Sequence, residues 1–182
     1  MDVLTAIRTR RSHKLFTGQP VTREVLEELV QLATWAPNHH YTEPWRFSVV
    51  GHARLPAMAE AIELQLGSEP AARNQAVKIR GILSGAGAAI ALRQVLTPGD
   101  AVREREDYAA CCCAMQNIQL GAWSHGLGSY WTTSPAMIGE KLHAFWQVQP
   151  GEQLVGAIIL GHPALQMPAI RHKPTSELTD WL

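Results

Sequence analysis

Apolar residues recur at helical spacing in four stretches of the chain. Side chains three and four positions apart share one face of a helix, so this spacing predicts amphipathic helices. Asp2 and Thr22 each precede such a stretch and suit an N-cap, where a side-chain oxygen accepts a backbone N–H. Pro37 marks the end of the second stretch. The expected helices span residues 2 to about 10, 22–36, 55–66 and about 102–125.

Short apolar runs bounded by glycine and proline predict strands. The expected strands are residues 46–50, closed by Gly51, then 88–96, 129–132 and 153–160. The last run is apolar on both faces, which is typical of a strand covered on both sides of a sheet. No internal repeat or linker divides the chain. We therefore predict one α+β domain over residues 1–182, with about four strands and helices on both sides.

Three segments have a weaker pattern. Residues 73–80 could be helical, and Gly81 to Gly87 contain three glycines but no following Gly-Lys-Ser/Thr, so we expect a flexible connection rather than a phosphate loop. Ser134-Pro135 opens a helix that we expect to run to about Phe145. Residues 164–182 are punctuated by proline, and we expect an extended arm that lies over another surface.

The composition narrows the classes of function. Of the 182 residues, 46% are apolar and 18% are charged, and the formal net charge of zero argues against a nucleic-acid partner. No apolar run approaches the roughly 18–20 residues of a membrane-spanning helix. The consecutive Cys111, Cys112 and Cys113 fit neither a disulfide framework nor a zinc knuckle. We expect a cytoplasmic protein that has no membrane partner and no metal site, with its cysteines packed as small residues.

The candidate chemistry begins at residues 8–16, where three arginines, a lysine and a serine lie close together. Guanidinium groups, an ammonium group and a hydroxyl suit the several acceptor oxygens of a phosphate. A solvated basic helix end is the alternative interpretation. A phosphate-ester enzyme would also need a metal or a nucleophile, and the sequence offers no candidate for either.

The loop at residues 38–45 is polar and aromatic. A metal site of His39, His40 and Glu43 would need these side chains on one helix face, and the prolines at 37 and 44 disfavour that helix. Trp45 begins a strand, so we assign it to the core. Trp131 could belong to the core or to a ligand site.

Several separated motifs together resemble one family. They are Arg10-Arg11-Ser12, Ala36-Pro37 with Pro44-Trp45, residues 126–131 (Gly-Leu-Gly-Ser-Tyr-Trp), and residues 160–163 (Leu-Gly-His-Pro) followed by Arg171-His172-Lys173. In this order and spacing the chain resembles the flavin-dependent nitroreductases, in particular the short members. The resemblance implies a three-layer fold with a mostly antiparallel sheet of four to five strands. It also implies a homodimer with two FMN sites at the subunit interface.

The resemblance further implies an activity. FMN would be reduced by NADH or NADPH and would then reduce a small-molecule acceptor at the same face, in a ping-pong reaction. Nitroaromatics, quinones and enones are the usual acceptors of such enzymes. No residue stands out as an obligatory general acid or base, which fits hydride transfer between stacked rings. It fits equally a non-catalytic protein that stores or senses FMN, and this is our alternative.

Individual roles follow from the same resemblance. Arg10 and Ser12, with Arg11 beside them, would hold the phosphate and ribityl oxygens of FMN. Lys14 would approach the N1–C2 side of the ring, where a cation stabilises the charge left by reduction. The remaining implied contacts are Arg171 and Lys173 at the phosphate, Trp131, Thr132 and Thr133 behind the ring, and Asn38 and His39 from the partner chain.

The chain departs from the family pattern in the loop at 38–45. Many members have Ser at the position of Asn38, Asn at that of Tyr41 and Gln at that of Glu43. A carboxylate near a flavin that becomes anionic is unfavourable unless it is paired. These departures bear on substrate choice and on contacts with the ring edge.

Overall fold

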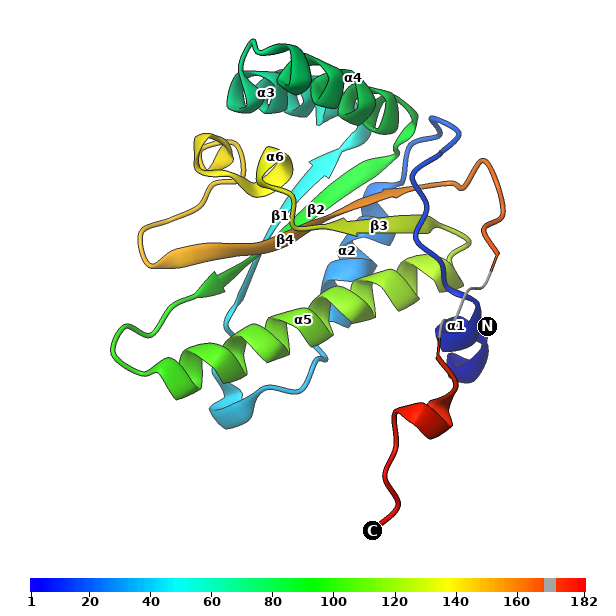
Figure 1. The fold of residues 1–182 in the computed structure, drawn as a ribbon, viewed down its shortest axis with the longest axis vertical. Coiled ribbons are helices and arrows are strands. Elements are labelled where there is room, and N and C mark those ends of the chain that lie inside the picture. The colour runs from blue at the N-terminus through cyan, green and yellow to red at the C-terminus, as the bar shows by residue number, and fades with distance from the viewer. Residues whose placement is uncertain (169–172) are drawn as a thin grey trace.

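A computed structural model describes residues 1–168 and 173–182 of the chain. The described part forms a four-stranded antiparallel sheet in the order β1-β2-β4-β3, with helices on both faces (Figure 1). The strands are β1 (Trp45–Gly51), β2 (Ala88–Val95), β3 (Gly128–Thr132) and β4 (Glu152–Gly161). The helices are α1 (Val3–Thr9), α2 (Arg23–Ala33), α3 (Leu55–Leu66), α4 (Pro70–Gly85), α5 (Ala101–Ser124) and α6 (Pro135–Ile138). The predicted α+β class and two-sided sheet are confirmed.

The two faces of the sheet carry two separate cores, because alternate side chains of a strand point to opposite faces. Ile90 and Ile158 are paired across β2 and β4 and pack with α2 and α5. Ala91, Ala157 and Ile159 belong to the other core, with α3, α4 and α6. Strand β4 lies between β2 and β3 and is fully buried from Ala157 to Leu160, so its predicted central position is confirmed.

Local signals placed most helix boundaries correctly. The Asp2 side chain accepts the Thr5 N–H at 3.0 Å, and Thr22 accepts the Val25 N–H at 3.5 Å. Helix α3 has the bounds expected for it, with Pro56 in its first turn and Gly67 after its end. No helix in residues 1–168 or 173–182 combines the length and apolar character needed to span a bilayer.

The prediction of a flexible connection at Gly81 to Gly87 is wrong. Helix α4 runs on through Gly85. A Cβ at Gly85 would lie 2.7 Å from the Phe16 carbonyl oxygen, and one at Gly87 would lie 2.6 Å from that of Gln19. These glycines therefore permit a close approach of residues 16–19 to the end of the helix, rather than flexibility.

The helix expected from Ser134 to Phe145 is also wrong, because it is interrupted. Helix α6 ends at Ile138, and a short 3₁₀ helix, Glu140–Leu142, follows Gly139. The Gln65 side chain from α3 lies at the break, where it donates to the Pro135 carbonyl at 3.3 Å and accepts the Lys141 N–H at 3.0 Å. A side chain inserted into the hydrogen-bond ladder is a recognised cause of helix breaks.

The three cysteines on α5 differ in their surroundings. Cys111 is buried, Cys112 is half-buried and Cys113 is exposed, so the packing prediction is correct for the first two and wrong for the third. Burial, with smaller contributions from Cys112 and Asp107, raises the pKa of the Cys111 thiol to about 12. Cys111 is therefore protonated at neutral pH and packs as an apolar side chain.

The chain beyond Gly161 leaves the body of the domain. The Ala164 N–H donates to the Leu15 carbonyl at 3.1 Å, and residues 164–168 and 173–182 are exposed. Figure 1 shows the C-terminus far from the sheet, and the Trp181 side chain is 92% exposed.

Candidate functional site

The basic segment after α1 lies along the outer side of β3. Ser12 forms a parallel bridge with Ser129, and the His13 N–H donates to the Ser129 carbonyl at 2.9 Å. Further along, Phe16 forms an antiparallel bridge with Pro163. The segment is therefore held beside β3 at Ser12 and beside the chain that follows β4 at Phe16.

His13 anchors this segment and was missed by the sequence analysis. Its side chain is buried, and its ring stacks on Trp123 of α5 with 5.6 Å between the centroids. The His13 Nδ1–H donates to the Arg11 carbonyl at 2.9 Å, and the Trp123 indole donates to the Thr9 hydroxyl at 2.8 Å. These contacts fix the residues on either side of His13. A histidine inside a basic run gives no local signal of burial.

Gly128 leaves the space that the His13 ring occupies. A Cβ at this position would lie 2.8 Å from His13 Cγ. We expect Gly128→Ala to displace the ring and to destabilise the fold by about 1–3 kcal/mol, the usual cost of overpacking. Chemical denaturation would measure this. Gly126→Ala does not serve as a control because of its positive φ, but Gly81→Ala does, since a Cβ there meets nothing within 4 Å.

Arg10, Ser12, Trp131 and Thr133, four of the residues predicted for the site, line one cavity of about 400 Å³. Gln116 and Gln119 of α5 complete its lining. Trp131 lies opposite Ile158 in the sheet and so faces α5, and its Nε1–H is buried without a hydrogen-bond partner among the described residues. Together they offer a cation, hydroxyls, amides and an indole, a donor set that fits a polar ligand bearing a phosphate.

Lys14 lines a different hollow from Arg10. Its ammonium group is 4.5 Å from the centre of the Tyr130 ring, and Tyr130 faces α6 and α4 because it pairs with Ile159. Lys14 and Thr132 share a hollow of about 370 Å³ with Gln75 and Lys78 of α4. Within the described part of the chain neither lysine has an ion pair. Two unpaired cations in one hollow favour an anionic or electron-rich ligand group.

Gln75 and Lys78 were not predicted from the sequence. They are three residues apart and therefore lie on one face of α4. This spacing is the only feature of the local sequence that relates the two residues to each other. Ser12 and Lys14 also line a third hollow, of about 360 Å³, with Leu15, Leu165 and Met167. Ser12 thus lines two hollows, the cavity that contains Arg10 and this one, which contains Lys14.

Five predicted residues are not placed with this group: Arg11, Arg171 and Lys173, and also Asn38 and His39. Arg11 does not line the cavity, and its guanidinium donates to the Arg10 carbonyl at 2.6 Å. Arg171 lies outside the described residues, and Lys173 is exposed. The described residues contain no group of three or more metal-ligating side chains.

Asn38 and His39 lie at the opposite end of α5. The His39 Nδ1–H donates to Glu106 at 2.9 Å. Glu106 and Gln116 are about 15 Å apart along the helix axis, at ~1.5 Å per residue. The structure of one chain therefore does not bring Asn38 and His39 to the Arg10 cavity. Trp45 is buried in the core, as expected.

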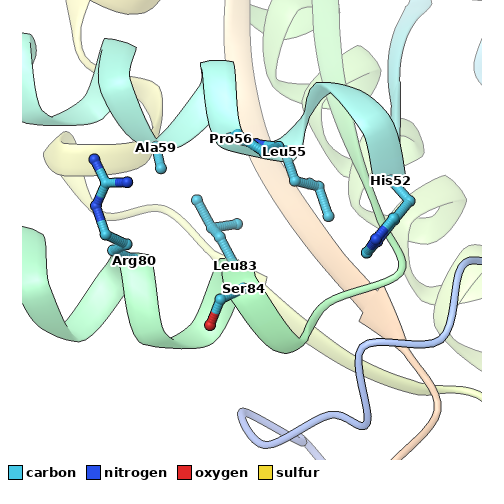
Figure 2. A pocket seen from close by; sticks show the side chains of 7 residues that line it. All are labelled: His52, Leu55, Pro56, Ala59, Arg80, Leu83 and Ser84. Atoms are coloured by element: carbon cyan, nitrogen blue, oxygen red, sulfur yellow. The ribbon is translucent and has the colours of Figure 1, made fainter.

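A hollow between α3 and α4 contains none of the predicted residues. Figure 2 shows its lining, with His52 at one end, Arg80 at the other and Ser84 beside Leu83 between them. Each of these polar side chains already has a partner. His52 donates to the Ala86 carbonyl at 3.0 Å, Ser84 to that of Gly81 at 3.0 Å, and Arg80 pairs with Glu63 at 2.7 Å. This hollow is therefore not a candidate site.

Comparison with known proteins gives a consistent result. The sequence profile of the nitroreductase family matches residues 7–162. A Bacillus subtilis protein provisionally named NAD(P)H nitroreductase YfhC is 31% identical over 164 residues, which cover 86% of this chain and 82% of that protein.

Two solved structures share the fold over nearly the whole chain. A nitroreductase-like family protein from Bacillus cereus is 26% identical with a TM-score of 0.89, and the match covers 100% of this chain and 96% of that one. A protein from Desulfovibrio desulfuricans, described as a nitroreductase in complex with FMN, is 26% identical with a TM-score of 0.77, covering 98% and 95%. The predicted resemblance is confirmed: the chain belongs to the nitroreductase family.

Proposed function

We propose that this protein is an FMN-dependent oxidoreductase that passes electrons from NADH or NADPH to a small-molecule acceptor. The observation that carries the proposal is the cavity in which Arg10 and Ser12 meet Trp131 and Thr133. The FMN complex of the Desulfovibrio relative supports this choice of cofactor. Nitroaromatics, quinones and enones are the acceptor classes that we propose.

The four predicted residues of the cavity, and Lys14 with its neighbours in the second hollow, each have a role in this proposal. Arg10 and Ser12 hold the phosphate and ribityl oxygens, since a guanidinium and a hydroxyl can each donate to them. Trp131 and Thr133 back the ring. Lys14, with Gln75 and Lys78 beside it, lies at the ring edge and supplies positive potential there. Bound FMN supplies the hydride chemistry, and the protein supplies binding, orientation and charge.

We propose that the functional unit is a homodimer. The exposed side chains of Val3, Leu4 and Ile7 give α1 an apolar outer face, which is typical of an interface. Asn38 and His39 then reach the site of the partner subunit, which accounts for their distance from Arg10 within one chain. Arg171 and Lys173 are proposed as further phosphate contacts.

The test is anaerobic mixing of the purified protein, loaded with FMN, with NADH and separately with NADPH. We expect rapid loss of the flavin absorbance at ~450 nm and its return when a nitroaromatic or quinone is added. A stable oxidised spectrum with both donors would favour the alternative, a protein that binds FMN without turnover. Protein that does not retain added FMN would contradict both functions.

A further inference from the structure

The loop that joins α2 to β1 is held in an unfavourable backbone conformation. His40, Tyr41 and Glu43 have φ values of 56°, 52° and 44°, a region that residues with a side chain rarely occupy. Such conformations persist only where the surrounding structure imposes them, and they concentrate at functional sites. The Tyr41 side chain is nevertheless 91% exposed, so burial of its ring does not explain the strain.

The residue between Tyr41 and Glu43 is hydrogen-bonded to a buried carboxylate on α5. The Thr42 hydroxyl donates to Asp107 Oδ1 at 2.5 Å, and Asp107 is only 3% exposed. The hydroxyl lies 3.5 Å from Asn38 Oδ1, and it has one proton, so Asp107 is its acceptor. Asn38 Oδ1 in turn accepts the Glu43 N–H at 3.0 Å and closes the loop.

The second oxygen of Asp107 has a weaker partner. Arg103 Nε lies 3.9 Å from Asp107 Oδ2, across one turn of α5. A carboxylate is costly to bury unless it is hydrogen-bonded. The short contact with Thr42 is thus the main described contact of a buried charge that the proposed chemistry does not use.

The loop presents aromatic rings to solvent. His39 and His40 are stacked with 3.8 Å between their centroids, and Glu106 holds His39 from α5. Tyr41 follows them directly, on the same outward-facing turn. Rings that are held rigidly at a surface can pack on a flat ligand with little loss of conformational entropy.

We propose that Asp107 is a positioning residue which, through Thr42, holds Tyr41 and the His39–His40 pair as a fixed aromatic wall for planar electron acceptors at the flavin site of the partner subunit. The proposal rests on the proposed function and adds a determinant of acceptor choice to it. The proposal attributes the selectivity for planar acceptors to the hydrogen bond between Thr42 of the loop and Asp107 of α5.

The test compares a planar acceptor, nitrobenzene, with a compact one, ferricyanide, in the FMN-loaded enzyme. Thr42→Val removes the hydroxyl and keeps the shape of the side chain. We expect KM for nitrobenzene to rise on the order of ten-fold, the size of one lost hydrogen bond to a charged group, with KM for ferricyanide and FMN content unchanged. Thr42→Ser restores the hydroxyl and is expected to restore KM.

Two further variants separate positioning from stability. Thr34→Val removes a hydroxyl that donates to the Gln31 carbonyl near the end of α2, and it should leave both KM values unchanged. Tyr41→Gly removes the ring and the backbone strain together, so we expect KM for nitrobenzene to rise while Tm stays the same or increases. A purely structural role for the loop would not raise KM without lowering Tm.

The outcomes also distinguish this proposal from the proposed function. Wild-type protein that reduces neither acceptor overturns both. Wild-type activity, with KM for nitrobenzene within about twofold of wild type in Thr42→Val and Tyr41→Gly, overturns only the role of Asp107 and the loop. Tyr41→Gly keeps the test decisive even where Thr42→Val does not fold.

Discussion

Replacing Arg10 and Lys14 together by alanine is expected to weaken FMN binding by about two to four powers of ten, because two hydrogen bonds to charged groups contribute about 1.5–3 kcal/mol each. The two residues line different hollows, Arg10 the cavity that contains Trp131 and Lys14 the hollow that contains Lys78. Ser12 lines the Arg10 cavity and also a third hollow together with Lys14. Arg10→Ala removes a contact that we propose at the phosphate. Lys14→Ala removes a cation that we propose at the ring edge. Equilibrium dialysis, or gel filtration of the flavin-loaded protein, would measure the loss.

Arg8→Ala with Lys141→Ala is the matched control for this variant. It removes the same number of positive charges, and both side chains are exposed and outside the two hollows. We expect FMN retention like that of the wild type. Equal retention by the Arg10/Lys14 variant would show that net charge and the rest of the cavity, rather than these two cations, hold the cofactor.

Where structure depends on neighbours in the sequence, the prediction from sequence was good. The capping side chains of Asp2 and Thr22 act within three residues of themselves, and their helices begin where expected. The apolar run in β4 is dictated by burial on both faces, and the strand is central. The capping residues and the apolar run can both be recognised from a short stretch of sequence, without knowledge of the fold.

Where structure depends on distant contacts, the prediction failed. The break after α6 is made by Gln65, which comes from α3. Positions 85 and 87 have no space for a Cβ because residues 16–19 approach them closely. In the sequence alone, glycines at these positions look like part of a flexible connection. Neither contact can be recognised before the fold is known.

The candidate site shows the same division. Family motifs identified Arg10, Ser12, Trp131 and Thr133, which the fold gathers around one cavity. His13 was missed because its role depends on the Trp123 ring of α5. Asn38 and His39 are separated from that cavity because the loop that carries them contacts a different part of the long helix α5. In our proposal they reach such a cavity only in a second chain.

The largest expected effect on stability is at the pair formed by Arg93 of β2 and Glu152 of β4. Arg93 Nη1 lies 2.8 Å from Glu152 Oε2, and both side chains are only 9% exposed. Arg93 also donates to the Gln147 carbonyl, and the same Glu152 oxygen accepts the Gln149 N–H at 2.9 Å. Removing one partner of such a pair leaves an uncompensated buried charge, at a cost of about 3–5 kcal/mol.

We therefore expect Glu152→Ala to lower Tm by roughly 6–20 °C, since about 1 kcal/mol corresponds to ~2–4 °C in a domain of this size. Glu152→Gln keeps an oxygen that can accept the Gln149 N–H, and its Tm should fall between those of the wild type and Glu152→Ala. Glu27→Ala breaks the pair with Arg23, in which the side chains are 63% and 86% exposed, and it should leave Tm nearly unchanged because water screens that pair. Equal shifts in Glu152→Ala and Glu27→Ala would contradict the argument that burial, rather than ion pairing itself, sets the cost.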